Sequence, residues 1–336
     1  MKKWKKSLIC SVLTMAMVFA SAVGCDGNDS ESSSADASSS STSSVESKPT
    51  GNNLFADEDY KNGFNIYGTG INGATRDLQK TVTFTEGTSP VWSIAQWYSQ
   101  HHLDKGTVTD NANLFKIQDE AKIFQLNKKT GAITMGLNAS KEFNSVQTPT
   151  SVAAFWPHLL LEQTNAPVKM KDCDTMRAYL KFRIDRATDC SVQFGNVAIQ
   201  MQAQFAWFIY VKNVNPDSPG YNEFLWFGFN IYNPKALYAP TVSQQDYAGG
   251  TAGNYIYSIG AAKWNNNKRV KIGDTVELNV DMFTAVQEGL DKAHAAGFMT
   301  GTTMEDVAIT GMNIGFEVFD VWDMQTTIFD LGVYYT

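Results

Sequence analysis

Apolar and polar residues alternate with a period of two along several segments of this chain, and that alternation limits what the chain can fold into. Positions 176, 178, 180, 182 and 184 are Met, Ala, Leu, Phe and Ile, whereas 177, 179, 181 and 183 are Arg, Tyr, Lys and Arg. Successive side chains of a strand point to opposite faces, so this pattern predicts a strand with one buried and one solvated face. Similar alternation predicts strands at 199–211, 276–280 and 312–318, and a last strand at 327–335.

A hairpin and one helix complete the predicted elements. Segments 121–126 and 133–137 flank a turn at 127–131, which is typical of a β-hairpin. Apolar residues recur at helical spacing over 282–293, with Asp281 as the expected N-cap and Gly297 as the expected end. Many strands and one late α-helix predict an all-β fold, a two-sheet antiparallel β-sandwich of jelly-roll or concanavalin-like type.

The first 24 residues have the layout of a signal peptide. Lysines at positions 2, 3, 5 and 6 precede a run without charged residues at 7–24, which ends in small residues. The junction Ala22-Val23-Gly24-Cys25 resembles the bacterial lipobox, in which the cysteine is lipidated and becomes the first residue of the mature protein. We therefore expect lipidation of Cys25 and a location on the extracellular face of a bacterial cell membrane. An ordinary secretion signal with a coincidental cysteine is the alternative.

Residues 25–53 are expected to form a linker, and 54–336 the β-sandwich domain. Serine dominates 30–47, and no aromatic residue occurs between Phe19 and Phe55, so this stretch is expected to be disordered. Loss of the four signal-peptide lysines would take the formal charge from −7 to −11. Such an acidic chain binds nucleic acid poorly, because both carry negative charge, so we expect no nucleic-acid partner. We expect contact with the membrane through the lipid anchor only.

The cysteine and histidine pattern predicts no cofactor. The four histidines lie at 101, 102, 158 and 294, and no Cys or His spacing matches a zinc site. A structural calcium ion stays open, because loop oxygens leave no readable spacing. Cys173 and Cys190 remain for a disulfide outside the cell, but they flank opposite ends of the strand expected at 175–185, which argues against pairing.

Aromatic residues make up 12% of the chain, and seven of the eight tryptophans follow the linker. Flat rings with polar tips suit the apolar faces of sugar rings, although most rings in a sandwich of this size fill its core. Three tryptophans adjoin the strands discussed next and are predicted to form a platform for polysaccharide or oligosaccharide: Trp207, Trp226 and Trp322.

Two predicted strands carry glutamates that suit glycan chemistry. The segment 223–232 is apolar on both faces, which indicates a central strand, and Glu223 stands at its start. In 312–318, Asn313, Gly315 and Glu317 share the face opposite the apolar residues, so this strand is suited to lie under a ligand. Two carboxyl groups at one site are what glycoside hydrolysis requires.

These two segments resemble strands of the family-twelve endoglucanases. Tyr221–Phe227 is similar to their Tyr-Glu-Leu-Met-Ile-Trp-Leu strand, with Asn222 inserted, and Gly315–Val318 to their Gly-Phe-Glu strand near the C-terminus. The resemblance covers about 203–336. It implies a retaining jelly-roll glycoside hydrolase with Glu223 as nucleophile and Glu317 as acid/base.

Three functions remain open from the sequence. The first is recognition of polysaccharide by a lipid-anchored sandwich, with Trp207, Trp226, Asn313 and Trp322 in contact with the glycan. The second is endo-acting retaining hydrolysis by Glu223 and Glu317. The third is an adhesin or envelope scaffold that contacts protein. Lectins of concanavalin type share such a sandwich without a catalytic pair, so fold alone does not choose among these functions.

Overall fold

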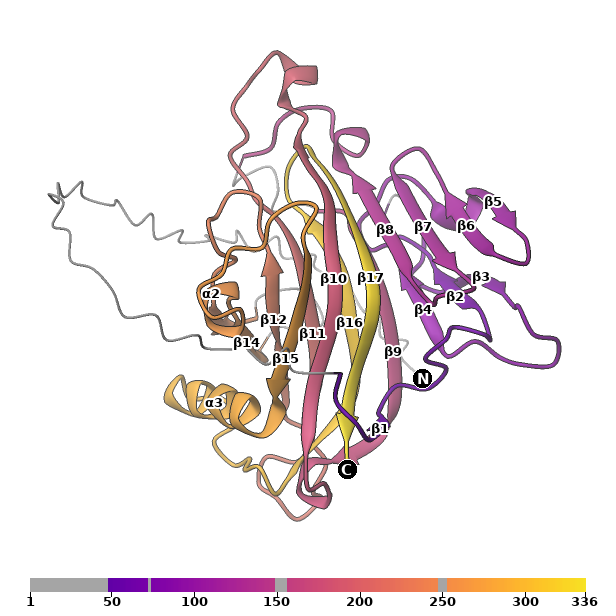
Figure 1. Cartoon of the computed structure of the whole chain (residues 1–336). Coiled ribbons are helices and arrows are strands. Elements are labelled where there is room, and N and C mark those ends of the chain that lie inside the picture. The colour runs from indigo at the N-terminus through magenta and orange to yellow at the C-terminus, as the bar shows by residue number, and fades with distance from the viewer. Residues whose placement is uncertain (1–47, 72–73, 149–155, 247–252) are drawn as a thin grey trace, which may run out of the picture. The chain divides into compact units, whose positions relative to one another are not determined.

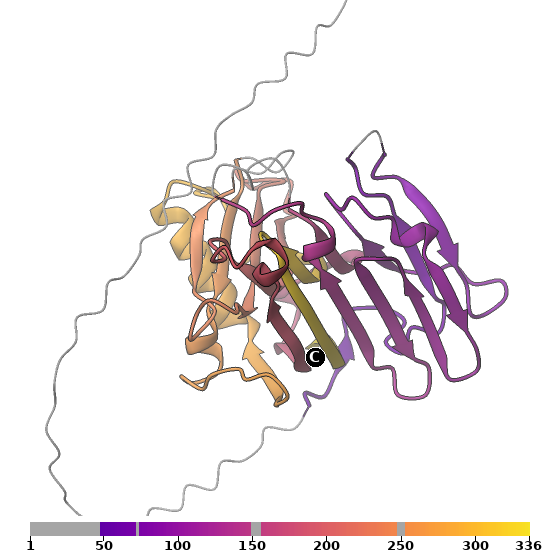
Figure 2. The same ribbon diagram turned by 90° about the horizontal axis from the view of Figure 1, so that it is seen from above.

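The computed structural model describes residues 48–71, 74–148, 156–246 and 253–336, and the strands in these ranges form two sheets that pack face to face. All strand pairs are antiparallel except β2 (Phe64–Tyr67) with β4 (Trp92–Ala95) and β12 (Phe224–Tyr232) with β14 (Tyr255–Ile259), which are parallel. The predicted two-sheet β-sandwich is thus confirmed. Figures 1 and 2 show long central strands with the N-terminal strands on one side and the C-terminal helices on the other.

The first sheet has the order β15-β10-β17-β8-β7-β6-β5, with β1 paired to β17. Its strands are β1 (Asn52–Asn53), β5 (Thr107–Asp110), β6 (Leu114–Gln118), β7 (Lys122–Asn127), β8 (Ile133–Asn138), β10 (Met176–Asp189), β15 (Thr275–Asp281) and β17 (Trp322–Tyr335). We call it sheet A. Strands β7 and β8 form the predicted hairpin.

The second sheet has the order β13-β14-β12-β11-β16-β9-β4-β2-β3 and is called sheet B. Its strands are β2 (Phe64–Tyr67), β3 (Leu78–Val82), β4 (Trp92–Ala95), β9 (His158–Lys169), β11 (Ala203–Asn213), β12 (Phe224–Tyr232), β13 (Val242–Gln245), β14 (Tyr255–Ile259) and β16 (Val307–Val318). Strand β12 is central, as its two apolar faces predict, whereas β11 begins four residues later than the sequence suggests.

Short helices connect the strands, and one longer helix packs on the core. The short ones are η1 (Leu103–Lys105), η2 (Ala139–Lys141), η3 (Met170–Asp172), η4 (Ser191–Phe194) and α2 (Ala261–Trp264). Helix α3 (Met282–Ala295) is the predicted late helix. The Asp281 carboxylate accepts a hydrogen bond from the Thr284 amide, which confirms the expected N-cap. Gly297 follows the helix at φ 84°, a conformation that favours glycine.

The core lies between the two sheets and is rich in aromatic rings. Each fully buried large apolar side chain contributes about 1.5–3 kcal/mol relative to exposure, so the aromatic core dominates the stability of the sandwich. The largest fully buried side chains include Trp92, Trp207, Tyr257, Phe64, Phe115, Phe124, Phe182, Phe205, Phe227, Phe229 and Phe316.

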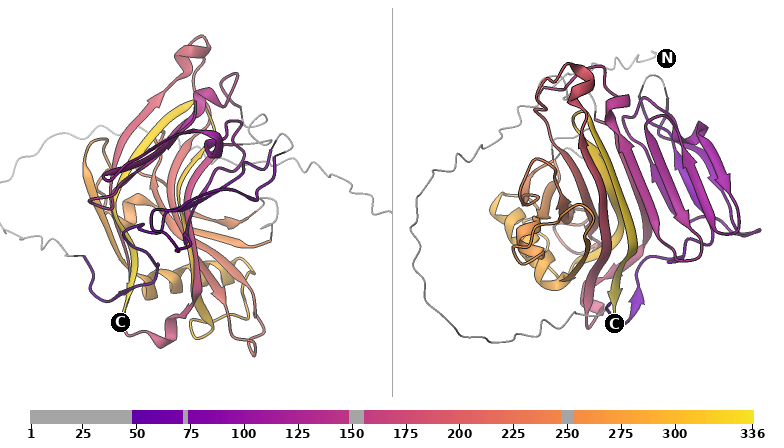
Figure 3. Two further views of the ribbon diagram at one scale, coloured as in Figure 1. Left: turned by 90° about the vertical axis from the view of Figure 1, so that its right-hand side faces the viewer. Right: turned by 45° about the horizontal axis from the view of Figure 1, so that its top comes forward.

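The folded domain begins earlier than the expected boundary at residue 54. Contacts divide the chain after Ser47, so Lys48 to Asn53 belong to the domain. Strand β1 pairs Asn52 and Asn53 with Tyr335 and Tyr334, which places the C-terminal strand beside the chain's entry into the domain (Figure 3). Serine-poor composition after Ser47 is the signal that the linker prediction overlooked. Residues 1–47, including the predicted signal peptide and Cys25, lie outside the described residues.

Cys173 and Cys190 are free thiols. Cys173 precedes β10 and Cys190 follows it, so the 14-residue strand separates them, as the sequence predicts. Burial raises the pKa of both thiols above the ordinary value, so neither is activated for chemistry.

Candidate functional site on the outer face of sheet B

Sheet B has one face toward the core and one face away from it, which we call the outer face. On β16, Met312, Ile314 and Phe316 are fully buried in the core, and alternate residues point to the outer face. The predicted grouping of Asn313, Gly315 and Glu317 on the face opposite the apolar residues is therefore confirmed. Directly paired residues of neighbouring strands point to the same side of a sheet, so the residues paired with these positions also lie on the outer face.

A polar cluster occupies the middle of the outer face. Asn313 lies opposite Glu162 of β9 and Phe208 of β11. The Asn313 side-chain amide donates to the Tyr210 hydroxyl at 3.1 Å, and the Trp97 indole donates to the Glu162 carboxyl. These four residues (Trp97, Glu162, Tyr210 and Asn313), with the ring of Trp226, are called the central site below.

Glu162 has an unusual protonation state for a carboxyl group. It keeps some exposed surface, but the protein packed around it raises its pKa from 4.5 to about 7. Burial is the main cause, and the Trp97 hydrogen bond and the Arg76 charge oppose it. Burial likewise raises the pKa of Tyr210, and the nearby Glu162 charge adds to that rise. The central site therefore offers a neutral hydroxyl and a carboxyl that exchanges its proton near neutral pH.

Half-buried aromatic rings flank the polar cluster on both sides. On β11 and β12, the Trp226 ring is nearly perpendicular to Tyr210, Phe224 and Phe208, with centroid distances of 5.1, 4.8 and 6.0 Å. Beyond β4, the Arg76 guanidinium lies 5.1 Å from the Trp97 ring and 4.7 Å from the Tyr98 ring. Rings thus stand on either side of hydrogen-bonding groups, an arrangement that suits sugars, which present apolar faces and equatorial hydroxyls.

Strand β16 carries no side chain on either side of Asn313 along the outer face. The neighbouring outward positions are Gly311 and Gly315, at φ 155° and 156°. A Cβ at Gly315 would lie 2.1 Å from the Leu159 carbonyl oxygen, and one at Gly311 would lie 2.6 Å from that of Gln163. Larger residues are therefore excluded by backbone atoms, and the central strand stays bare beside the amide of Asn313.

Glu317 lies further along the outer face, paired with Gln204 of β11 and His158 of β9. The His158 Nε2 atom is 3.7 Å from a Glu317 carboxyl oxygen. Burial lowers the pKa of His158, and the negative charge of Glu317 opposes that effect. His158 Nδ1 lies 2.8 Å from the Trp156 carbonyl, which fixes the ring orientation.

Glu223 lies at the other end of the sheet. Its carboxylate accepts a 2.7 Å hydrogen bond from the Thr302 hydroxyl, and its carbonyl accepts from the Asn213 amide. Asn213 is nine residues from Gln204 on β11, the residue paired with Glu317. At about 3.3 Å per residue, about 30 Å of strand separate the two glutamates. A retaining pair needs about 5–5.5 Å and an inverting pair about 6.5–9.5 Å, so the hypothesis of Glu223 and Glu317 as one catalytic pair is wrong.

The predicted tryptophan platform is only partly placed on this face. Trp226 points outward beside Tyr210 and is half-buried. Trp207 is fully buried, and its indole donates to the Met312 sulfur at 3.2 Å. Trp322 is in the core cluster and donates to the Met201 carbonyl at 3.2 Å. The prediction of Trp207 and Trp322 as glycan contacts is therefore wrong, because both belong to the inward-facing set of their strands.

The sequence reasoning missed Trp97, Glu162 and Tyr210. Tyr210 has the opposite parity to the apolar face at 203–211, so its place was readable from alternation. Residues 158–161 of β9 are apolar on both faces apart from His158, which hid Glu162. Trp97 follows the end of β4 and reaches the site only through the fold.

The described residues contain no group of three or more His, Cys, Asp or Glu side chains placed to hold a metal ion. Within the same ranges, none of the helices has the length and apolarity needed to cross a membrane.

Comparisons with known proteins show no family for this chain. No family model and no curated protein sequence matches the chain. Among solved structures, endoglucanase Cel12A from Rhodothermus marinus aligns at 14% identity and TM-score 0.34, over 69% of this chain and 96% of its own. A family 12 xyloglucanase from Bacillus licheniformis aligns at 13% identity and TM-score 0.39, over 69% of this chain and 97% of its own. A family 11 xylanase from Neocallimastix patriciarum aligns at 9% identity and TM-score 0.35, over 68% of this chain and 95% of its own. These identities are too low to transfer an activity or a catalytic residue to this chain.

Proposed function

We propose that this protein is a lipid-anchored cell-surface protein that recognises polysaccharide on the outer face of sheet B. The observation that carries the proposal is the central site, where half-buried rings flank a hydrogen-bonded cluster of carboxyl, amide and hydroxyl groups. Trp97 and Trp226 supply flat surfaces for sugar rings, and Glu162 and Asn313 supply partners for sugar hydroxyls.

The chemistry of the central site favours a neutral, hydroxyl-rich ligand. Its rings offer apolar contact, its polar groups both donate and accept, and Glu162 is neutral over part of the physiological pH range. The negative formal charge of the whole chain opposes polyanions, nucleic acids among them. The outer face of a sheet is long and open, so it suits an extended glycan chain better than a compact small molecule.

Binding is favoured over hydrolysis because the proposed catalytic pair is split. Hydrolysis remains the second candidate, and Glu162 is the observation in its favour, since a pKa of about 7 suits a general acid. Glu317, another carboxyl on this face, pairs with His158, four residues from Glu162 on β9. About 13 Å of strand thus separates the two positions. A protein-binding scaffold is not favoured by the exposed apolar residues. The large ones, such as Leu78, Val192 and Leu237, lie in separate parts of the sequence.

A glycan panel run in parallel with a reducing-sugar assay tests the function. The proposal predicts binding to at least one polysaccharide without release of reducing ends. Release of reducing ends that Glu162→Gln abolishes, with binding intact, would establish the hydrolase instead. No binding across a broad panel would refute recognition of polysaccharide.

Folding stability should fall with pH through the titration of Glu162. Its pKa is raised on folding, so the folded protein keeps a proton that the unfolded chain has lost. The stability due to this group is full below its unfolded pKa, near 4.5, and is lost as the pH rises through about 7. Glu162→Gln stays neutral at every pH and should flatten this decline, as measured by urea unfolding at about pH 5 and about pH 8. Equal pH slopes for the variant and the wild type would show that Glu162 is not the buried acid.

The lipid anchor makes a separate prediction. Cys25→Ala should move the protein from the membrane fraction to the soluble fraction, because it removes the proposed site of lipid attachment. Mass spectrometry of the N-terminal peptide should find acylated Cys25 in the wild type. An unmodified Cys25 and unchanged fractionation would contradict the anchor without touching the glycan site.

A further inference from the structure

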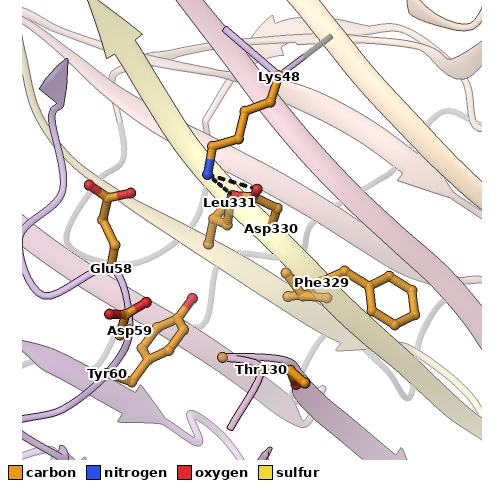
Figure 4. Close-up of a pocket in the computed structure, with 10 residues that line it drawn as sticks. Lys48, Glu58, Asp59, Tyr60, Thr130, Phe329, Asp330 and Leu331 are labelled. Carbon is orange, nitrogen blue, oxygen red and sulfur yellow. Dashed lines mark hydrogen bonds and ion pairs between the residues drawn. The ribbon is translucent and has the colours of Figure 1, made fainter. Parts of the chain in front are cut away.

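A small cavity lies away from the outer face, where the chain enters the domain. It has a volume of about 140 Å³, is partly open to solvent, and is lined by residues 58–60, the β7–β8 turn at 130–131, and residues 328–331 of β17, with Lys48 at its edge (Figure 4). Drug-sized ligands need about 300–1,000 Å³, so this cavity accepts one small molecule or one side chain.

Tyr60 presents an unpaired hydroxyl to this cavity. The residue is 5% exposed, and its ring packs against Trp92 and Phe64 at centroid distances of 5.2 and 5.8 Å. Figure 4 shows the hydroxyl directed into the space between Glu58 and Asp330, and no described residue forms a hydrogen bond with it. The residue is buried but its hydroxyl reaches the cavity, so a ligand or water in the cavity can bond to it.

The cavity wall carries more negative than positive charge. Three carboxylates line it, from Glu58, Asp59 and Asp330, against one cation, Lys48. Lys48 is held at 2.8 Å from one Asp330 oxygen, with its ammonium 5.0 Å from the centre of the Tyr334 ring. Asp59 is paired with Lys61, whereas Glu58 has no ion pair among the described residues. The carboxylates are not gathered as metal ligands among the described residues.

We infer that this cavity binds the primary ammonium group of a small ligand. Lys48 already shows the chemistry, because its ammonium lies between the Asp330 carboxylate and an aromatic ring. A second ammonium in the cavity would donate to the unpaired Tyr60 oxygen and to Glu58, the two acceptors without partners. An amino sugar and the lysine side chain of a peptide share this chemistry. The site is independent of the proposed glycan face, which lies on the other sheet.

Calorimetric titration of the full chain with four probes tests the inference. The probes are glucosamine, glucose, Nα-acetyl-lysine amide and Nα-acetyl-norleucine amide, which separate the ammonium from the rest of each molecule. Binding of glucosamine but not glucose identifies an amino-sugar site, and binding of the lysine probe but not the norleucine probe identifies a side-chain site. Equal binding of the charged and uncharged members of both pairs, or no binding of any probe at millimolar concentration, would overturn the inference.

Matched variants place the binding at this cavity. Tyr60→Phe removes only the hydroxyl and should weaken the amine about tenfold, because hydrogen bonds to charged groups are among the stronger ones. Glu58→Gln should weaken amine binding a few-fold. Glu86 is an exposed acid outside the cavity lining, so Glu86→Gln should leave amine binding unchanged. If Tyr60→Phe leaves the affinity for the amine unchanged, the amine binds outside this cavity. Because both cavity variants leave Trp97 and Trp226 intact, their polysaccharide binding reports separately on the outer face.

Discussion

Trp97→Ala is expected to weaken polysaccharide binding by roughly thirtyfold or more, corresponding to about 2 kcal/mol, as for a central aromatic contact. The change removes a ring surface for sugar and also the indole donor to Glu162. Trp226→Ala should act similarly from the other side of the central site, where its ring packs against Tyr210 at 5.1 Å. Affinity electrophoresis in gels that contain the bound polysaccharide, followed by calorimetry, measures both losses.

Tyr221→Ala is the matched control for these variants. Tyr221 is 50% exposed in the turn between β11 and β12, away from the central site, so its removal should leave the affinity unchanged. All three variants should keep wild-type circular dichroism, because they remove partly exposed rings. Equal losses in Tyr221→Ala and Trp97→Ala would show that the glycan does not lie on the outer face.

Glu142→Ala is expected to destabilise the fold by about 3 kcal/mol, because it removes one of the two carboxylates that pair with the buried Lys122, the other being Asp119 at 2.9 Å. Lys122 and Glu142 are 3.2 Å apart, and both side chains are fully buried. The Glu142 carboxylate also accepts from the Ser99 hydroxyl at 2.5 Å and the Gln100 amide at 2.6 Å. This cluster joins β7 to the chain after β4 and to the residue after η2, so its loss should lower the midpoint of urea unfolding for the whole domain.

Glu120→Ala serves as the control for this prediction. Glu120 is 82% exposed and lies 3.9 Å from His101, so its removal should change the stability by less than about 0.5 kcal/mol. Lys122→Met combined with Glu142→Leu should regain only part of the lost stability, because it leaves the nearly buried Asp119 carboxylate without its lysine. A Glu142→Ala protein as stable as wild type would contradict the view that this ion pair is sealed from water.

Strand alternation was enough to predict the architecture. The faces at 176–184 and 312–318, the hairpin at 121–137 and the helix capped by Asp281 all appear as expected. Each depends on contacts within a strand, a hairpin or a helix, and such local patterns are written directly in the sequence. Strand β1 (Asn52–Asn53) precedes the expected domain start at residue 54 and is ordered by β17, a strand more than 260 residues later in the sequence, so its local sequence gives little sign of it.

The site was less predictable because it depends on register between distant strands. Glu223 and Glu317 both stand in plausible local contexts, yet pairing through β11 puts them at opposite ends of sheet B. Trp207 and Trp322 adjoin the candidate strands in the sequence, but a shift of one residue along a strand moves a side chain from surface to core, and both lie in the core. Glu162 acquires its raised pKa from packing around it, which no sequence motif records.

The most direct test of the glycan face is to follow the indole N–H resonances of the tryptophans by NMR during titration with a polysaccharide fragment that binds. The account predicts that the Trp97 and Trp226 signals shift with the ligand, while those of the buried Trp207 and Trp322 stay in place. Assignment by single Trp→Phe variants identifies each signal. Shifts that spare Trp97 and Trp226, in a protein that demonstrably binds the fragment, would contradict polysaccharide recognition on the outer face of sheet B.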